Sequence, residues 1–184
     1  MIPKPADTSI APLEEALDAA DHAARVAWMR SLKSKDMDAL YEMAAGRDVE
    51  PDYFLGPTGE PLAFIGRNSL PLFSDFKKAF AQHQDRIQGW NVNVGIARWF
   101  GGPGHFRVRN ADTYQGQLIF DYVWECDSVP EEFPAAESNL RLTNRLVYGN
   151  MEDVVRRVSK DLIISKAYRN GKPEGSFFSL CRPL

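Results

Sequence analysis

A histidine, an arginine and an aspartate in the middle of the chain have the types and spacing that general acid–base chemistry requires. Folding residues 104–110 against residues 116–124 places His105 opposite Asp121, with Arg107 beside them on the same face. A carboxylate opposite an imidazole fixes the ring tautomer and raises its basicity, and an adjacent guanidinium can stabilise a developing oxyanion. Alternatively, the three residues lie on the solvated face of a sheet, where such pairs give only modest stabilisation.

The other face of the same two segments is apolar and aromatic. It carries Phe106, Phe120, Tyr122 and Trp124, and the preceding segment adds Arg98 as the one charge on this face. In a barrel too wide for its side chains to fill, these rings would line a cavity for an apolar ligand. Arg98 would then hold a ligand carboxylate, and Tyr122 would offer its hydroxyl. The simpler alternative is a filled core, with Arg98 reaching water at the end of its strand.

Alternating apolar and polar residues predict the strands that position both sets. The pattern runs through Gln117–Glu125, and it recurs over residues 92–98 and 104–110 on either side of a turn at Gly101–Gly104. A side-chain period of two is that of a strand with one buried face, so three consecutive antiparallel strands are expected. A one-residue slip would mix the faces but a two-residue slip would not, so only the parity of the register is determined.

Apolar residues at helical spacing predict helices on the N-terminal side of this sheet. One apolar stripe runs from Leu13 to Leu32, and a second short helix fits Asp36–Ala45. A third helix is expected near residues 70–84, where apolar residues again recur at three and four positions. Residues 1–10 are expected to form a flexible tail, so the helical region covers residues 11–46.

The remainder of the chain, residues 60–184, is predicted to be mostly β-structure within a single domain that spans residues 1–184. Met151–Lys160 fits either a strand or one helical turn. Asn170–Pro173 has the composition of a turn between the last two strands. Short apolar runs predict the further strands at Leu62–Ile65, Leu140–Tyr148, Leu162–Tyr168 and Ser176–Arg182.

Composition limits the classes of partner. A chain of 184 residues that is 44% hydrophobic can bury one sizeable core. Its net charge of -3 gives no positive electrostatic field that would attract nucleic acid. No apolar run is long enough to span a bilayer. The two cysteines are too few for a disulfide framework, which favours a cytoplasmic setting, and the three histidines lack the spacing of a metal site. We therefore expect no metal and no cofactor.

Three C-terminal segments resemble the closing strands of lipocalin-like proteins of the kind associated with a GXWXG module. These segments are Gln117–Tyr122, Arg145–Met151 and Gly175–Arg182. Residues 161–182 are also similar to the last strands of the plastid lipid-associated fibrillin family. Both resemblances imply a calycin-type barrel that binds a lipid-like small molecule.

The order of the predicted elements is also similar to that of NTF2-like proteins, in which helices cover a strongly bent sheet. The segment Lys35–Leu40 resembles the second helix of that family. The resemblance implies a cofactor-free isomerase, dehydratase or cyclase with a His–Asp pair in its pocket. On this interpretation His105 and Asp121 form the pair, and Arg107 assists.

The expected fold class is therefore α+β, with N-terminal helices on a strongly curved antiparallel sheet or barrel. The principal hypothesis is that the barrel binds a small, largely apolar ligand, and the alternative is the NTF2-like enzyme. A third hypothesis is a protein-binding module, for which an exposed apolar patch on the helices would be the sign. The residues do not decide whether the protein is an enzyme, and a homodimer is compatible with them.

Overall fold

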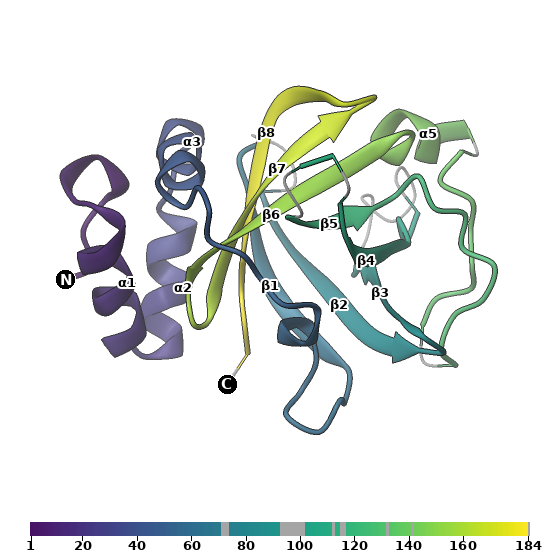
Figure 1. Cartoon of the computed structure of the whole chain (residues 1–184), viewed down its shortest axis with the longest axis horizontal. Helices are drawn as coiled ribbons and strands as arrows, with labels where there is room; N and C mark the ends of the chain where they lie inside the picture. Colours follow the sequence, from purple (N-terminus) through teal and green to yellow (C-terminus); the bar gives the residue numbers. More distant parts are fainter. Residues whose placement is uncertain are drawn as a thin grey trace.

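Eight antiparallel strands close into one barrel in which each strand pairs with its neighbours in sequence (Figure 1). The computed structural model describes residues 1–70, 74–92, 102–111, 113–114, 117–131, 133–140 and 142–183, apart from the side chains of residues 142 and 143. Pairing of the last strand with the first closes the barrel, which confirms the predicted fold class in its closed form rather than as an open cone. The strands are β1 (Leu62–Asn68), β2 (Asp75–His83), β3 (Arg86–Asn91), β4 (Phe106–Asn110), β5 (Leu118–Asp121), β6 (Met151–Ser159), β7 (Leu162–Arg169) and β8 (Lys172–Cys181).

The register between β4 and β5 has the predicted parity but differs from the expected pairing by two residues. Val108 pairs with Phe120, and Asp121 pairs with Arg107 instead of with His105. The predicted His105–Asp121 pair is therefore wrong. The physical reason is that a slip of two leaves every side chain on its own face, so the hydrophobic pattern cannot distinguish the two registers.

For two segments the predicted secondary structure is wrong, because a helix was expected where a strand is found and a strand where a helix is found. The segment predicted as a helix near residues 70–84 contains strand β2, and the segment predicted as a strand at Leu140–Tyr148 contains helix α5 (Leu142–Tyr148). Phe76 and Phe80 are four residues apart, a spacing that suits both a helix and a strand, and pairing with β1 and β3 decides for the strand. The partner of β4 on the other side is β3 rather than residues 92–98, of which residues 93–98 lie outside the described part of the chain.

Three N-terminal helices cover the outer face of the barrel beside β6, β7 and β8 (Figure 1). They are preceded by a 3-10 turn, η1 (Pro5–Asp7), and comprise α1 (Ile10–Ala19), α2 (His22–Arg30) and α3 (Ser34–Met43). The single helix predicted from Leu13 to Leu32 is broken because Ala20 is extended and the Asp21 carboxylate caps α2, accepting a hydrogen bond from the Ala24 amide at 2.7 Å. Within the described residues, no helix has the length and apolar character needed to cross a membrane.

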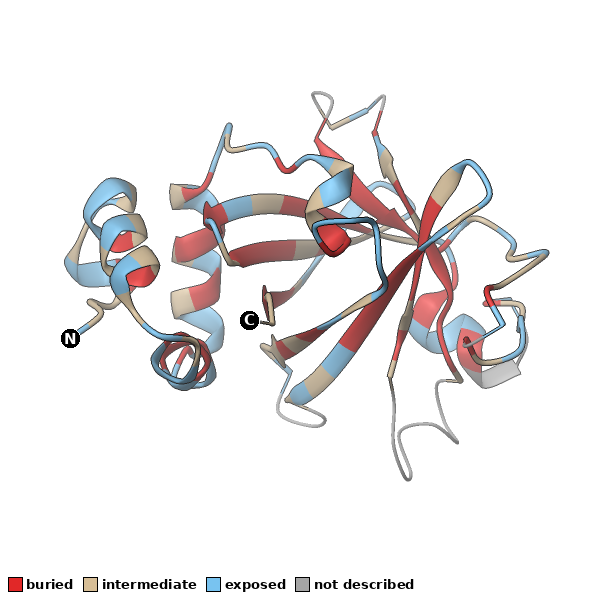
Figure 2. Ribbon diagram, turned by 90° about the horizontal axis from the view of Figure 1, so that it is seen from below, coloured by how far each residue is buried: buried red, intermediate tan, exposed pale blue. Residues whose placement is uncertain are grey.

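The helices and the barrel bury separate hydrophobic clusters. The outer cluster joins helix residues such as Leu17 and Met37 to Ile164 and Phe177 of the barrel wall. The inner cluster lines the barrel interior with aromatic rings, and Figure 2 shows that the strands are largely buried whereas the outer surfaces of the helices are exposed. The inner cluster includes Phe106, Val108, Leu118, Phe120 and Tyr122, as the predicted parity requires.

One end of the barrel is closed by the 3-10 turn η2 (Pro51–Phe54). Phe54 is completely buried, and its ring centroid lies 4.6 Å from that of Phe80, 5.1 Å from that of Phe120 and 5.7 Å from that of Phe64. Such centroid separations are those of packed aromatic pairs. This end is therefore filled by side chains, and we call it the apolar end.

Candidate functional site

A buried lysine at the other end of the barrel is the centre of the candidate site. Lys78 lies between Phe76 and Phe80 on the inward face of β2 and is only 3% exposed. Its Nζ donates a hydrogen bond to Oδ1 of Asn91, the residue directly opposite it on β3, at 2.7 Å, and another to the Tyr122 hydroxyl. Burying an ammonium is costly unless other groups compensate, so a lysine in this place needs an explanation.

Aromatic rings surround the Lys78 amine. Nζ lies 4.8 Å from the ring centroids of Phe106 and Phe178 and 5.2 Å from that of Tyr122. Phe76 and Phe120 follow at 5.6 and 5.7 Å. Rings at these distances attract a cation, so they offset part of the cost of burying the ammonium while they keep water away from it.

An aspartate on β6 supplies the opposite charge. Asp153 is 2% exposed, and it shares the inward face of β6 with Val155. Burial raises the pKa of Asp153 to about 6, although the positive charge of Lys78 and a hydrogen bond with Tyr122 act against that rise. Burial likewise lowers the pKa of Lys78 to about 8, against the opposing effect of Asp153. The two pKa values are therefore much closer together than those of an ordinary lysine and aspartate.

Tyr122 and Asn91 connect this pair to the segments that cover it. The Tyr122 ring stacks on Tyr148 of α5, with centroids 5.2 Å apart and planes inclined by only 6°. Asn91 Nδ2 donates to the carbonyl oxygen of Gly104 at 3.3 Å. Gly104 has φ of +53°, and a Cβ added there would lie 2.4 Å from the Tyr148 ring. We call the group formed by Lys78, Asp153, Tyr122 and Asn91 the polar end of the barrel.

The structure brings together three of the five predicted ligand-binding residues. Phe106, Phe120 and Tyr122 share the barrel interior. The predicted inward position of Trp124 is wrong: β5 ends at Asp121, and the Trp124 ring lies outside the inner cluster, with the Arg86 guanidinium carbon 5.4 Å from its centroid. Arg98, the predicted polar anchor, lies outside the described residues.

The predicted catalytic residues are divided between two environments. Asp121 accepts hydrogen bonds from Nε of Arg107 at 2.9 Å and Nε of Arg109 at 2.8 Å. His105 is buried, its Nε2 lies 3.2 Å from the Ala135 carbonyl oxygen, and burial lowers its pKa. Because the Asp121 carboxylate binds arginines on the outer face, it is not available to orient the His105 ring, and the expected dyad is not formed.

The sequence reasoning missed both ionisable residues of the polar end. Lys78 stands in the middle of a Phe-x-Lys-x-Phe pattern, which on a strand puts the lysine on the same buried face as both rings. Asp153 is likewise two residues before the buried Val155. The sequence signal is a charge in the apolar phase of a strand, and for Lys78 it is hidden because the apolar residues around it also fit the spacing of a helix.

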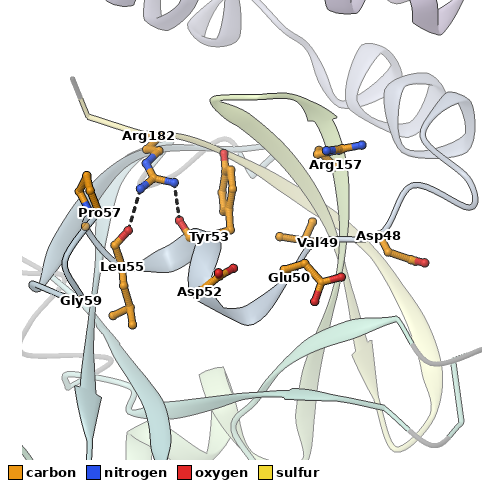
Figure 3. Close-up of a pocket in the computed structure, with 11 residues that line it drawn as sticks. Asp48, Val49, Glu50, Asp52, Tyr53, Leu55, Pro57, Gly59, Arg157 and Arg182 are labelled. Carbon is orange, nitrogen blue, oxygen red and sulfur yellow. Dashed lines mark hydrogen bonds between the residues drawn. The ribbon is translucent and has the colours of Figure 1, made fainter.

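A cavity of about 700 Å³ lies at the apolar end, where its lining includes Val49 and Leu55 of the inner cluster (Figure 3). The lining of this cavity includes two arginines, Arg157 and Arg182, and three acidic residues, Asp48, Glu50 and Asp52. Nη1 and Nη2 of Arg182 donate to the carbonyl oxygens of Tyr53 and Leu55 at 2.9 and 2.7 Å, as the dashed lines in Figure 3 show. These two hydrogen bonds hold η2 in place at the end of the barrel, so Arg182 has a structural role here.

Comparison with known proteins adds no relative to this description. No protein-family model matches the chain, and searches of curated proteins and of solved structures found no match. The architecture itself is calycin-like, because a closed antiparallel barrel of eight strands carries its helices on the outside. Function therefore has to be inferred from the polar end of the barrel.

Proposed function

We propose that the protein binds a small, largely apolar molecule at the polar end of the barrel, with an oxygen atom of that molecule held by Lys78. The observation that carries this proposal is the buried Lys78–Asp153 pair inside an aromatic barrel. Buried ionic groups are often less stabilising than apolar residues of similar volume, so their presence has to be explained by something other than stability. Ionisable groups with strongly shifted pKa values cluster at functional sites.

The hydrogen bonds of Lys78 support an anchoring role. An ammonium has three donors, and Asn91 and Tyr122 take two of them. A ligand oxygen can accept the third. Because the site excludes water, a hydrogen bond made there is stronger than the same bond at the surface.

The rings around Lys78 define the remainder of the ligand. Phe106 and Phe178 lie closest to the amine, and Phe120 and Tyr122 extend the same aromatic surface. An aromatic or lipid-like body would contact these rings, while its oxygen faces Lys78. This combination of an apolar wall with few polar groups is typical of small-molecule sites. The proposed ligand is thus of the lipid-like class that the calycin-like resemblance implies, and Lys78 takes the role of polar anchor that the sequence suggested for Arg98.

Displacement of a dye tests the proposal. We expect Nile red to bind saturably with increased fluorescence, and cinnamyl alcohol to displace it. Lys78→Met should weaken the binding of cinnamyl alcohol by about tenfold, the effect of one lost hydrogen bond in a buried site. Lys77→Met, on the exposed side of the same strand, and Trp124→Ala, on the outside of the barrel, are the matched controls and should bind as the wild type does.

Two results would contradict this function. One is the absence of saturable binding of either compound to the folded wild-type protein. The other is equal affinity of the wild type and Lys78→Met for cinnamyl alcohol, which would show that the lysine takes no part in holding the oxygen.

A further inference from the structure

We propose that Lys78 forms a covalent imine with aldehydes or ketones that enter the polar end of the barrel. This inference rests on the proposed function, since the carbonyl compound must occupy the same site. It goes further because it assigns a reaction and a substrate class to Lys78. The amine that anchors an alcohol by a hydrogen bond would attack a carbonyl carbon held in the same position.

The geometry around Nζ prepares the amine for attack. Asn91 on β3 and Tyr122 just after β5 hold the nitrogen from two sides, so its direction is set by atoms of the barrel wall. A substrate carbonyl in contact with Phe106 and Phe178 would lie within reach of the nitrogen, because both ring centroids are 4.8 Å away. Holding nucleophile and electrophile in one place removes much of the entropic barrier to their reaction.

Burial also supplies the reactive form of the amine. Only a neutral amine has the lone pair that attacks a carbonyl, and lysines become nucleophilic when burial lowers their pKa. Desolvation outweighs the effect of Asp153 and lowers the pKa of Lys78 to about 8, so a larger fraction of this amine is neutral near pH 7 than in an ordinary lysine. The rings that exclude water also protect an imine from hydrolysis, which is the reverse reaction.

Asp153 supplies the proton that the addition needs. As Nζ attacks the carbonyl carbon, the C=O electron pair moves to oxygen, and this oxygen takes the proton of the Asp153 carboxyl group. The nitrogen then returns one proton to the Asp153 carboxylate, which leaves a neutral carbinolamine. The raised pKa of Asp153 makes the protonated form accessible near neutral pH.

Loss of water completes the reaction. The carbinolamine hydroxyl takes the proton back from Asp153 and leaves as water, while the nitrogen lone pair forms the C=N bond. The product is a protonated imine beside the Asp153 carboxylate. One amine and one carbonyl compound give one imine and one water, so the reaction needs no oxidant or reductant.

Reductive trapping tests the imine directly. The full-length protein is incubated with cinnamaldehyde and sodium cyanoborohydride, which reduces an imine to a stable secondary amine, and the modified peptides are identified by mass spectrometry. We expect Lys78 to be labelled at least about tenfold faster than the exposed Lys77, because burial lowers the pKa of Lys78 and the barrel holds the aldehyde beside its amine. Excess cinnamyl alcohol should suppress this labelling, since it can occupy the site but cannot form an imine.

Variants separate the roles of the two ionisable groups. Lys78→Arg should abolish the adduct at this position, whereas Lys77→Arg should leave it unchanged. Asp153→Asn should slow trapping about 100-fold, the usual contribution of a general acid, and should alter the pH dependence of the rate. If Lys78→Arg fails to fold by circular dichroism, the peptide map of the wild-type protein decides the question alone.

The outcomes distinguish this inference from the function on which it rests. Displacement of Nile red by cinnamyl alcohol, without faster labelling of Lys78 than of Lys77, would overturn the imine proposal and leave ligand binding intact. Failure of both the alcohol and the aldehyde to displace the dye would overturn both proposals. Rapid labelling of Lys78 that excess alcohol suppresses would support both.

Discussion

The two ends of the barrel are built from the same strands but in opposite ways. At the apolar end, Phe54, Phe64 and Phe80 are fully buried and in ring-to-ring contact, and no charged side chain takes part in that contact. At the polar end, Lys78 and Asp153 are equally buried but carry ionisable groups. Burial of rings stabilises the fold, whereas burial of charges opposes it.

This difference separates stability from function within one barrel. The apolar end closes the barrel and anchors η2, so its residues act through packing. The polar end keeps groups that a core selected for stability alone would replace with apolar ones. Residues that lower the stability of a protein are expected at its functional sites, where activity needs them.

Truncating the ring that closes the apolar end should give the largest effect. Phe54→Ala removes a completely buried ring that contacts four others, so the free energy of unfolding should fall by about 4 kcal/mol. Urea denaturation followed by circular dichroism measures this change. The control is Phe76→Ala at the polar end, where the partly exposed ring should cost much less. Equal losses at the two positions would mean that the ends do not differ in packing.

Replacing both charges at the polar end should have the opposite sign. We expect Lys78→Met combined with Asp153→Leu to raise the free energy of unfolding by about 2 kcal/mol, because two buried charges are exchanged for apolar groups of similar size. Asp153→Leu alone should be less stable than this double variant, since it leaves Lys78 without its counter-charge. The same urea titration measures both. A double variant as unstable as Phe54→Ala would show that the pair is structural.

Two aspartates should respond to pH in opposite directions. Burial alone would raise the pKa of Asp121, but hydrogen bonds from Arg109 and Arg107 outweigh it and hold the pKa below 3.8. The folded protein therefore binds fewer protons at Asp121 than the unfolded chain. The stability that Asp121 contributes, about 1 kcal/mol, is present above pH 3.8 and is lost as the pH falls below it.

For Asp153 the sign is reversed. Its pKa is raised from 3.8 to about 6, so the folded protein binds more protons than the unfolded chain between these values, and stability rises as the pH falls from 6 to 3.8. Over that range, the unfolding free energy of the wild type should rise relative to that of Asp153→Asn. The difference in unfolding free energy between the wild type and Asp121→Asn should stay constant over the same range and become smaller at lower pH. Parallel curves for the two variants would contradict the assigned environments.

Part of the candidate site was predictable because strand side chains alternate strictly. The parity of β4 and β5 placed Phe106, Phe120 and Tyr122 together in the interior, as observed. Parity did not predict that Asp121 pairs with Arg107, since a two-residue slip buries the same faces. It also failed for Trp124, because the chain leaves the strand after Asp121 and the alternation ends there.

The sequence by itself determined the fold class, the outward helices and the inward face of the central strands, since these follow from the periods of local hydrophobic patterns. The tertiary structure alone decided the position of Lys78. Its segment fits two periods, and only hydrogen bonding to β1 and β3 makes it a strand that points the amine inward. It also decided that the charges of Lys78 and Asp153, 75 residues apart in the chain, act on each other, because barrel closure brings distant strands around one interior. Local patterns carry no information about such long-range pairing, so the charges at the polar end could be recognised as a site only in the folded protein.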